Sequence, residues 1–295
     1  MKNPVSSIFI CAFWGMFLMS CSQLYKDRVV DKSTINGNDY RLFQGTSAWT
    51  LAKAVWTDNE SEIRSIVRAA PNIINFQEPK YGSTLLMMTI RNKQYKTFVV
   101  LLENKANYEI HDTYDGTSAL IDACNCDGCD IRFAQDLISN GANVNDIETG
   151  KRRSSNSTRY TPLIAGSQNG RLDLVELLIN AGADVNYKNE FNQSALSEAV
   201  LTEKLEVVLY LLKHGADYRI PVYYSYNSGN GVLLVEQLRK LTYDLNSARY
   251  DQKQAIIAFL RTRGIEYNEI PVPSYMVKKI QKKYPNNWKD YINKY

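Results

Sequence analysis

The sequence predicts an all-α fold, a solenoid of stacked helix-turn-helix repeats. One observation is a short phrase, Gly-Ala-Asp-Val-Asn at Gly182–Asn186, which returns in shortened form at Gly215–Tyr218. A second is that each copy follows a stretch with apolar residues at helical spacing, such as Leu174–Ile179. A unit of this size cannot bury its own apolar face, so we expect neighbouring units to stack on one another.

Weaker copies of the phrase extend the repeat in both directions. The interval from Gly141 to Gly182 and the interval from Gly215 to Gly264 are longer than the others. These long intervals indicate insertions, which we expect near residues 147–159 and 222–250. The further copies are Pro71–Asn75, Lys105–Tyr108, Gly141–Asn145 and Gly264–Asn268.

The unit that begins at Thr161 contains the local signals for two helices. Thr161 is a good helix cap, and Pro162 suits the first turn. Small residues at 165–167 allow the first helix to pack closely on its neighbour. Gly182 follows the second apolar stretch and can adopt the left-handed conformation that ends a helix.

These residues carry a family resemblance. Thr161–Ile179 resembles the ankyrin unit TPLHxAAxxGHxEVVxLLL, with Ile164 in the place of the histidine. The resemblance is strongest over Tyr160–Asp217 and covers roughly Trp49–Asn268. It implies an ankyrin-repeat solenoid of five to six repeats over residues 47–268, with a basic and aromatic C-terminal cap at 269–295.

Residues 1–20 have the order of an export signal, with one lysine before an apolar stretch that is shorter than the about 20 residues of a membrane span. The stretch ends Leu18-Met19-Ser20-Cys21, which resembles the lipobox of bacterial lipoproteins. The resemblance implies cleavage before Cys21, acylation of that cysteine with chains such as palmitate, and, because Ser22 follows, an outer-membrane anchor facing the periplasm. A plain signal peptide or an uncleaved anchor is the alternative. We expect the polar residues 21–46 to form a tether.

Three cysteines remain after export, Cys124, Cys126 and Cys129, in one turn between two helices. An oxidising compartment favours a disulfide between two of them, with one thiol left over. A metal site would need a fourth ligand, such as Asp127 or Asp130, and no histidine is near. A redox or metal module built on these cysteines is therefore a remote alternative.

The sequence predicts no enzyme activity and no cofactor or metal. The chain has only 2 histidines and lacks a phosphate-binding loop or a serine nucleophile elbow. Its net charge of +4 is small and scattered, so we expect no nucleic-acid partner.

Three departures from the repeat are candidates for function. Gly150–Arg159 is a basic insert, which is either a solvated loop or a cationic finger for an acidic partner. Pro221–Gly231 is rich in tyrosine, which either packs along the last repeats or forms a recognition loop. The lysine-rich residues 274–294 either form an amphipathic capping helix or contact anionic lipid or an acidic partner.

The ankyrin resemblance implies non-catalytic protein binding through finger loops and the concave face. Two roles fit an exported protein of this kind, an immunity protein that neutralises a periplasmic toxin and an accessory of a periplasmic enzyme. The candidate contact residues are Tyr114, Arg152, Arg153, Arg159, Tyr187, Phe191 and Tyr224.

Overall fold

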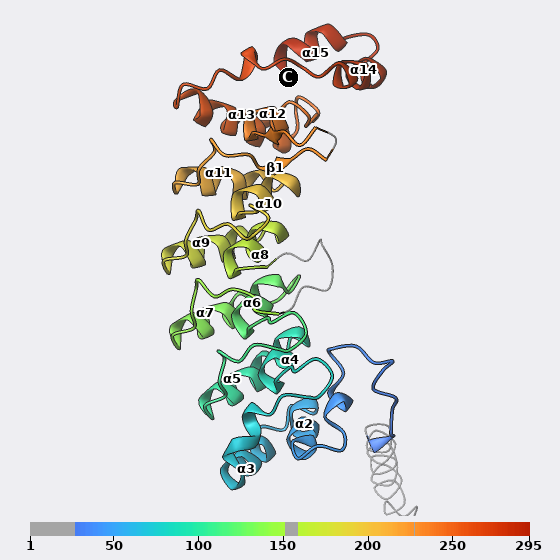
Figure 1. Ribbon diagram of the computed structural model, residues 1–295, viewed down its shortest axis with the longest axis vertical. Helices are drawn as coiled ribbons and strands as arrows, with labels where there is room; N and C mark the ends of the chain where they lie inside the picture. The colour runs from blue at the N-terminus through green and yellow to red at the C-terminus, as the bar shows by residue number, and fades with distance from the viewer. Residues whose placement is uncertain (1–26, 151–158, 227) are drawn as a thin grey trace, which may run out of the picture. The chain divides into compact units, whose positions relative to one another are not determined.

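The structure is a computed structural model that describes residues 27–150, 159–226 and 228–295, and its regular elements are almost all helices (Figure 1). The chain divides into two compact units, Met1–Ala119 and Leu120–Tyr295. The predicted signal peptide, the acylated Cys21 and the basic residues Arg152 and Arg153 lie outside the described residues.

Unit 1 contains two helix pairs preceded by a short 3-10 turn. Helices α2 and α4 lie on one side of the unit, and α3 and α5 lie on the other (Figure 1). Leu51, Leu86 and Phe98 are fully or almost fully buried between them. Its elements are η1 (Tyr40–Phe43), α2 (Trp49–Trp56), α3 (Glu60–Ala69), η2 (Pro71–Asn75), α4 (Leu85–Arg91) and α5 (Tyr95–Glu103).

The prediction that residues 21–46 form a tether is wrong for its last third. Tyr40, Leu42 and Phe43 are buried, and η1 packs against α2. The tyrosine ring lies 6.1 Å from the ring of Trp56, and Phe43 lies 6.2 Å from Phe76. These apolar side chains pack this segment against the first repeat and the start of the second.

Unit 2 repeats the pairing four times and then adds two helices. Helices α6, α8 and α10 line one side, and α7, α9 and α11 line the other (Figure 1). The paired helices are α6 (Ala119–Asn125) and α7 (Arg132–Ser139), α8 (Pro162–Asn169) and α9 (Leu172–Asn180), α10 (Ala195–Leu201) and α11 (Leu205–Lys213), and α12 (Leu234–Leu238) and α13 (Ala248–Arg261). The last elements are η3 (Tyr267–Glu269), α14 (Ser274–Lys283) and α15 (Trp288–Lys294).

The insertion predicted near 222–250 contains the only described strands, which the all-α prediction did not include. Strands β1 (Tyr223–Tyr224) and β2 (Gly231–Val232) form an antiparallel hairpin in which Tyr223 pairs with Val232. Gly231 is required here, because a Cβ atom at this position would lie 2.4 Å from Cγ of Pro221.

The helix signals predicted at Thr161, Pro162 and Gly182 are confirmed, and Ser194 caps a further helix. The Thr161 hydroxyl accepts a hydrogen bond from the Ile164 amide at 3.2 Å, and Pro162 occupies the first turn of α8. Ser194 and Ser197 bond reciprocally across the start of α10. Gly182 has a φ of +91°, a conformation that strains residues with a Cβ atom.

The last residue of the repeated phrase joins one repeat to the next. In unit 2, the Asn145 side chain accepts from the Asp184 amide at 2.7 Å and donates to the Gly182 carbonyl at 3.1 Å. Asn186 makes the same two bonds to the Asp217 amide (2.9 Å) and the Gly215 carbonyl (3.0 Å). The phrase therefore positions each loop on the following one.

The three cysteines lie at the turn between α6 and α7. Cys126 and Cys129 form a disulfide, and Cys124 is a free, buried thiol. Arg171, from the next repeat, donates to the Cys129 carbonyl at 2.9 Å. The disulfide thus closes a turn against which the following repeat packs.

Replacement of Asn186 by Ala should lower the free energy of unfolding by about 1–2 kcal/mol, because both ends of the amide lose a partner. Urea unfolding of the full chain measures this change. Asn180→Ala is the matched control, since Asn180 is exposed and forms no side-chain bond among the described contacts. Equal destabilisation by the two changes would contradict a bridging role for Asn186.

Candidate functional site

An exposed apolar patch lies in unit 2 between a finger loop, the end of α10 and the β hairpin. Phe191, Leu201 and Tyr224 are 36%, 42% and 53% exposed. They line one open hollow of about 330 Å³, and we name them the 191–224 patch. The rest of the lining is Asn192, Gln193, Val222 and Tyr223.

The finger loop presents Phe191 because a buried asparagine organises the turn beneath it. Asn189 is 4% exposed, and its side-chain oxygen accepts from the amides of Phe191 (2.9 Å) and Gln193 (3.0 Å). Asn192 follows with a φ of +62°, which asparagine tolerates better than most residues. Asn189 therefore holds the turn that presents Phe191.

The hairpin presents Tyr224 by holding the residue before it. The Tyr223 hydroxyl donates to Gln237 at 3.2 Å and accepts from the Lys240 ammonium at 2.6 Å. Side chains alternate along a strand, so Tyr224 lies on the opposite face and remains half exposed. Tyr226, two residues further on, is fully exposed.

Charged side chains lie beside the finger loop. Arg159 forms an ion pair with Glu190 at 3.3 Å. Burial and the Glu190 carboxylate raise the pKa of Tyr187, while Arg159 opposes the shift. Arg159 and Tyr187 therefore lie near Glu190, the residue before Phe191 in the finger loop.

The structure brings together only some of the predicted contact residues. Phe191 and Tyr224 line one hollow, with Arg159 and Tyr187 near its finger loop. Tyr114 lies in unit 1, where its ring meets that of Tyr81 edge-on at 5.1 Å.

Leu201 is a residue of the patch that was not predicted from the sequence. The signal was present, because Leu201 occupies the position that Gln168 has in the preceding repeat and puts an apolar residue where that repeat has a polar one. One turn earlier on α10, Glu198 is 4% exposed and accepts from the Gln168 amide at 3.0 Å. Burial raises the pKa of Glu198, so this face of α10 also holds a carboxyl in an apolar setting.

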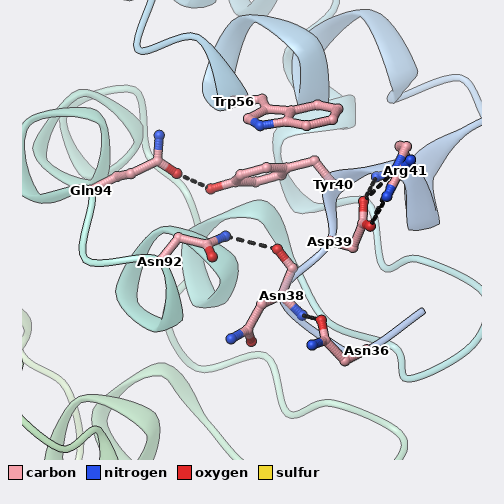
Figure 2. Close-up of a pocket in the computed structure, with 8 residues that line it drawn as sticks. All are labelled: Asn36, Asn38, Asp39, Tyr40, Arg41, Trp56, Asn92 and Gln94. Atoms are coloured by element: carbon pink, nitrogen blue, oxygen red, sulfur yellow. Dashed lines mark hydrogen bonds and ion pairs between the residues drawn. The ribbon is translucent and has the colours of Figure 1, made fainter. Parts of the chain in front are cut away.

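A second hollow, of about 400 Å³, lies in unit 1 where residues 36–41 meet α2 and the turn before α5 (Figure 2). Its polar side chains mainly bind one another. Asn92 donates to the Asn38 carbonyl at 3.0 Å, and the Tyr40 hydroxyl donates to Gln94 (Figure 2). Asp39 pairs with Arg41 at 2.6 Å. We interpret these bonds as the contacts that hold the N-terminal segment on the repeats of unit 1.

The cysteine turn has the properties of a structural link. Burial raises the pKa of the Cys124 thiol to about 12, so it stays protonated and unreactive near neutral pH. A three-sulfur metal site would need Cys126 and Cys129, whose sulfurs are bonded to each other. Among the described residues, no group of three or more His, Cys, Asp or Glu side chains is arranged to hold a metal ion.

Within the same residues, no helix is long and apolar enough to cross a membrane.

The chain is similar to known proteins that contain ankyrin repeats. Residues 132–221 match the family model for ankyrin repeats (3 copies). The chain carries ankyrin repeats. An ankyrin repeat protein of Acanthamoeba polyphaga mimivirus is 27% identical over 125 residues, which are 42% of this chain and 74% of that protein. The crystal structure of the ankyrin repeat domain of Bcl-3, a member of the IkappaB protein family, matches with a TM-score of 0.51 and 23% identity, over 70% of this chain and 79% of that one.

The ankyrin-repeat fold gives the 191–224 patch its context. Ankyrin repeats generally mediate protein–protein interaction. Phe191 lies on a finger loop and Leu201 on a first helix of a repeat, the two elements from which the resemblance predicts the binding surface.

Lys253, on α13 of unit 2, is a buried basic group. Lys253 is 1% exposed, and its ammonium donates to the Leu241 carbonyl at 2.9 Å and lies 3.7 Å from the centre of the Tyr295 ring. Buried Arg239 lies over the Tyr267 ring at 3.8 Å. Burial, aided by the charge of Arg239, lowers the pKa of Lys253 to about 7. The lysine is enclosed by the core, so we assign it a structural role.

Stability should rise with pH above 7 because of Lys253. The unfolded lysine keeps its proton up to about pH 10.4, whereas the folded one loses it near 7, so the unfolded state binds more protons between these values. The free energy of unfolding should increase by about 2 kcal/mol from pH 7 to pH 9 relative to Lys253→Met. Parallel pH curves for the two proteins would contradict this assignment, and Lys96→Met at an exposed position controls for the substitution itself.

Proposed function

We propose that this protein is a non-catalytic binding module that holds a partner protein at the 191–224 patch. One observation carries the proposal. Of the seven large apolar side chains exposed in the described residues, three line this hollow and a fourth, Tyr226, lies on the adjoining hairpin. Single exposed apolar residues are ordinary, but a cluster with a polar rim is typical of a protein interface.

The chemistry of the patch favours a protein partner. Aromatic side chains dominate binding energy at protein interfaces, since they bring a large contact area with few rotatable bonds. Leu201 adds an aliphatic surface, and the Arg159–Glu190 pair with Asn192 and Gln193 supplies polar groups at the edge. These features suit a partner segment that inserts one or two apolar side chains into the hollow and forms hydrogen bonds with the polar groups at its edge.

We further propose that the protein is lipid-anchored through Cys21 and faces the periplasm. The support is the lipobox resemblance together with the packing of the segment that follows. Asp27, which lies shortly beyond Cys21 in the chain, pairs with Lys53 of α2 at 3.1 Å. The intervening chain reaches at most roughly 20 Å, so an acylated Cys21 would hold unit 1 close to the bilayer surface.

Two roles for such a module follow from the resemblance, immunity against a periplasmic toxin and support of a periplasmic enzyme. They differ in the identity of the captured partner and not in the mode of binding. Identification of the captured partner therefore separates the two roles, since a toxin favours the first role and an enzyme favours the second.

The patch is tested with the triple variant Phe191→Ala, Leu201→Ala, Tyr224→Ala. We expect its affinity for the captured partner to fall at least tenfold, because anchors of this kind contribute about 2 kcal/mol or more. Tagged full-length protein is crosslinked in cells, the partner is identified by mass spectrometry, and its affinity is then measured with purified protein. Val29→Ala with Tyr275→Ala, two exposed apolar sites elsewhere, is the control. Unchanged affinity in a folded triple variant would refute the patch.

The anchor is tested with Cys21→Ala. We expect the variant to leave the membrane fraction or to accumulate at the precursor mass, because no acyl chain can attach. Membrane fractionation and intact-mass spectrometry of the two proteins measure both outcomes. Membrane association at the mature mass would show that Cys21 is not the anchor.

A further inference from the structure

The C-terminal residues 270–295 carry a one-sided charge. They contain six lysines, no arginine and a single acidic residue, Asp290. Lys283 pairs with Asp244 at 3.0 Å, and Lys294 pairs with Asp290 at 3.1 Å. The other four lysines are exposed and form no ion pair among the described contacts; they are Lys278, Lys279, Lys282 and Lys289.

Helix α14 gathers three of these lysines on one side. Successive residues of an α-helix are about 100° apart, so Lys278, Lys279 and Lys282 fall within an arc of about 100°, and Tyr275 falls within the same arc. Met276 and Ile280 point the other way and are 2% and 1% exposed. We name Lys278, Lys279 and Lys282 the α14 lysine face.

The apolar side of α14 is already buried within unit 2. Ile280 forms a cluster with Tyr291 and Tyr295, and the Tyr284 ring stacks on Tyr291 at 4.3 Å. The Tyr291 hydroxyl donates to the Tyr243 carbonyl at 2.7 Å, which fixes α15 to the loop before α13. Helix α14 therefore presents its lysines from a fixed position and has no apolar face left with which to enter a bilayer.

We propose that the α14 lysine face docks on the surface of a membrane that contains anionic lipid. Charge complementarity is the first support, because the exposed arc of α14 has no acidic residue to oppose a negative surface. Each lysine near such a surface contributes about a fivefold gain in binding. Three lysines should therefore favour anionic over neutral membranes by roughly 100-fold.

The residue types favour lipid over an acidic protein. Lysine is depleted at the core of protein interfaces, where arginine, with its planar fork for carboxylates, is enriched. The segment has no arginine at all. A flexible ammonium suits a diffuse layer of headgroups, and the 54% exposed Tyr275 adds an aromatic ring with a polar tip, which suits the interfacial region.

The experiment measures the partition onto vesicles of the purified mature chain, residues 21–295 with Cys21→Ala, which carries neither the apolar residues 1–20 nor an acyl chain. Vesicles of pure phosphatidylcholine are compared with vesicles in which phosphatidylcholine and phosphatidylglycerol are mixed two to one. The test variant is Lys278→Gln, Lys279→Gln, Lys282→Gln. The matched control is Lys96→Gln, Lys188→Gln, Lys213→Gln, which removes the same charge from exposed sites elsewhere.

We expect the test variant to lose roughly 100-fold in its preference for anionic vesicles and the control to keep most of it. The preference should also weaken as salt rises from about 0.05 to 0.5 M, because the screening length falls. An equal loss in both variants would overturn the proposal in favour of a net-charge effect. Binding of the unsubstituted lysine face to polyglutamate but not to the vesicles would overturn it in favour of an acidic protein.

Discussion

The asparagine at the end of the repeated phrase bonds to the backbone of the following repeat, and this bridge determines how the loops of unit 2 are arranged. Asn145 and Asn186 each use both ends of the amide, as acceptor for an N–H and as donor to a carbonyl. Unit 1 has a related bond from the Asn107 amide to the side chain of Asn75. Loop backbone that would otherwise depend on water is thereby paired within the fold.

Because these bonds lie at the bases of the loops, other groups hold the tips. The turn at Phe191 is held by Asn189, and the hairpin is held by Tyr223 and by the contact between Gly231 and Pro221. Phe191 and Tyr224 are both large and partly exposed at these tips. Tips that the fold already holds in place also suit a binding surface, since little entropy is lost when the partner docks.

The ends of the repeat array solve a different problem, because an end repeat has no neighbour to cover it. In unit 1, Tyr40 and Phe43 are buried against the first repeat and the start of the second. In unit 2, α14 and α15 cover the last one with a tyrosine cluster, and they enclose Lys253 in doing so. The α14 lysine face lies on the exposed side of this segment. Residues 274–294 therefore both complete the core of unit 2 and present a charged surface.

The sequence by itself determined the ankyrin-repeat fold, the helix start at Thr161 and the glycine after the second helix at Gly182, because these signals depend on neighbours within one or two turns. It also indicated Phe191 and Tyr224 as exposed. Only the tertiary structure decided that Leu201 joins them, that Tyr40 folds onto Trp56 and Gln94 instead of lying in a tether, and that Cys126 pairs with Cys129. Tyr40 and Gln94 are 54 residues apart, and no local pattern records a contact at that separation. The three cysteines lie close together in the sequence, so their spacing permits more than one disulfide pair. Only the path of the turn after α6 selects the pair that forms.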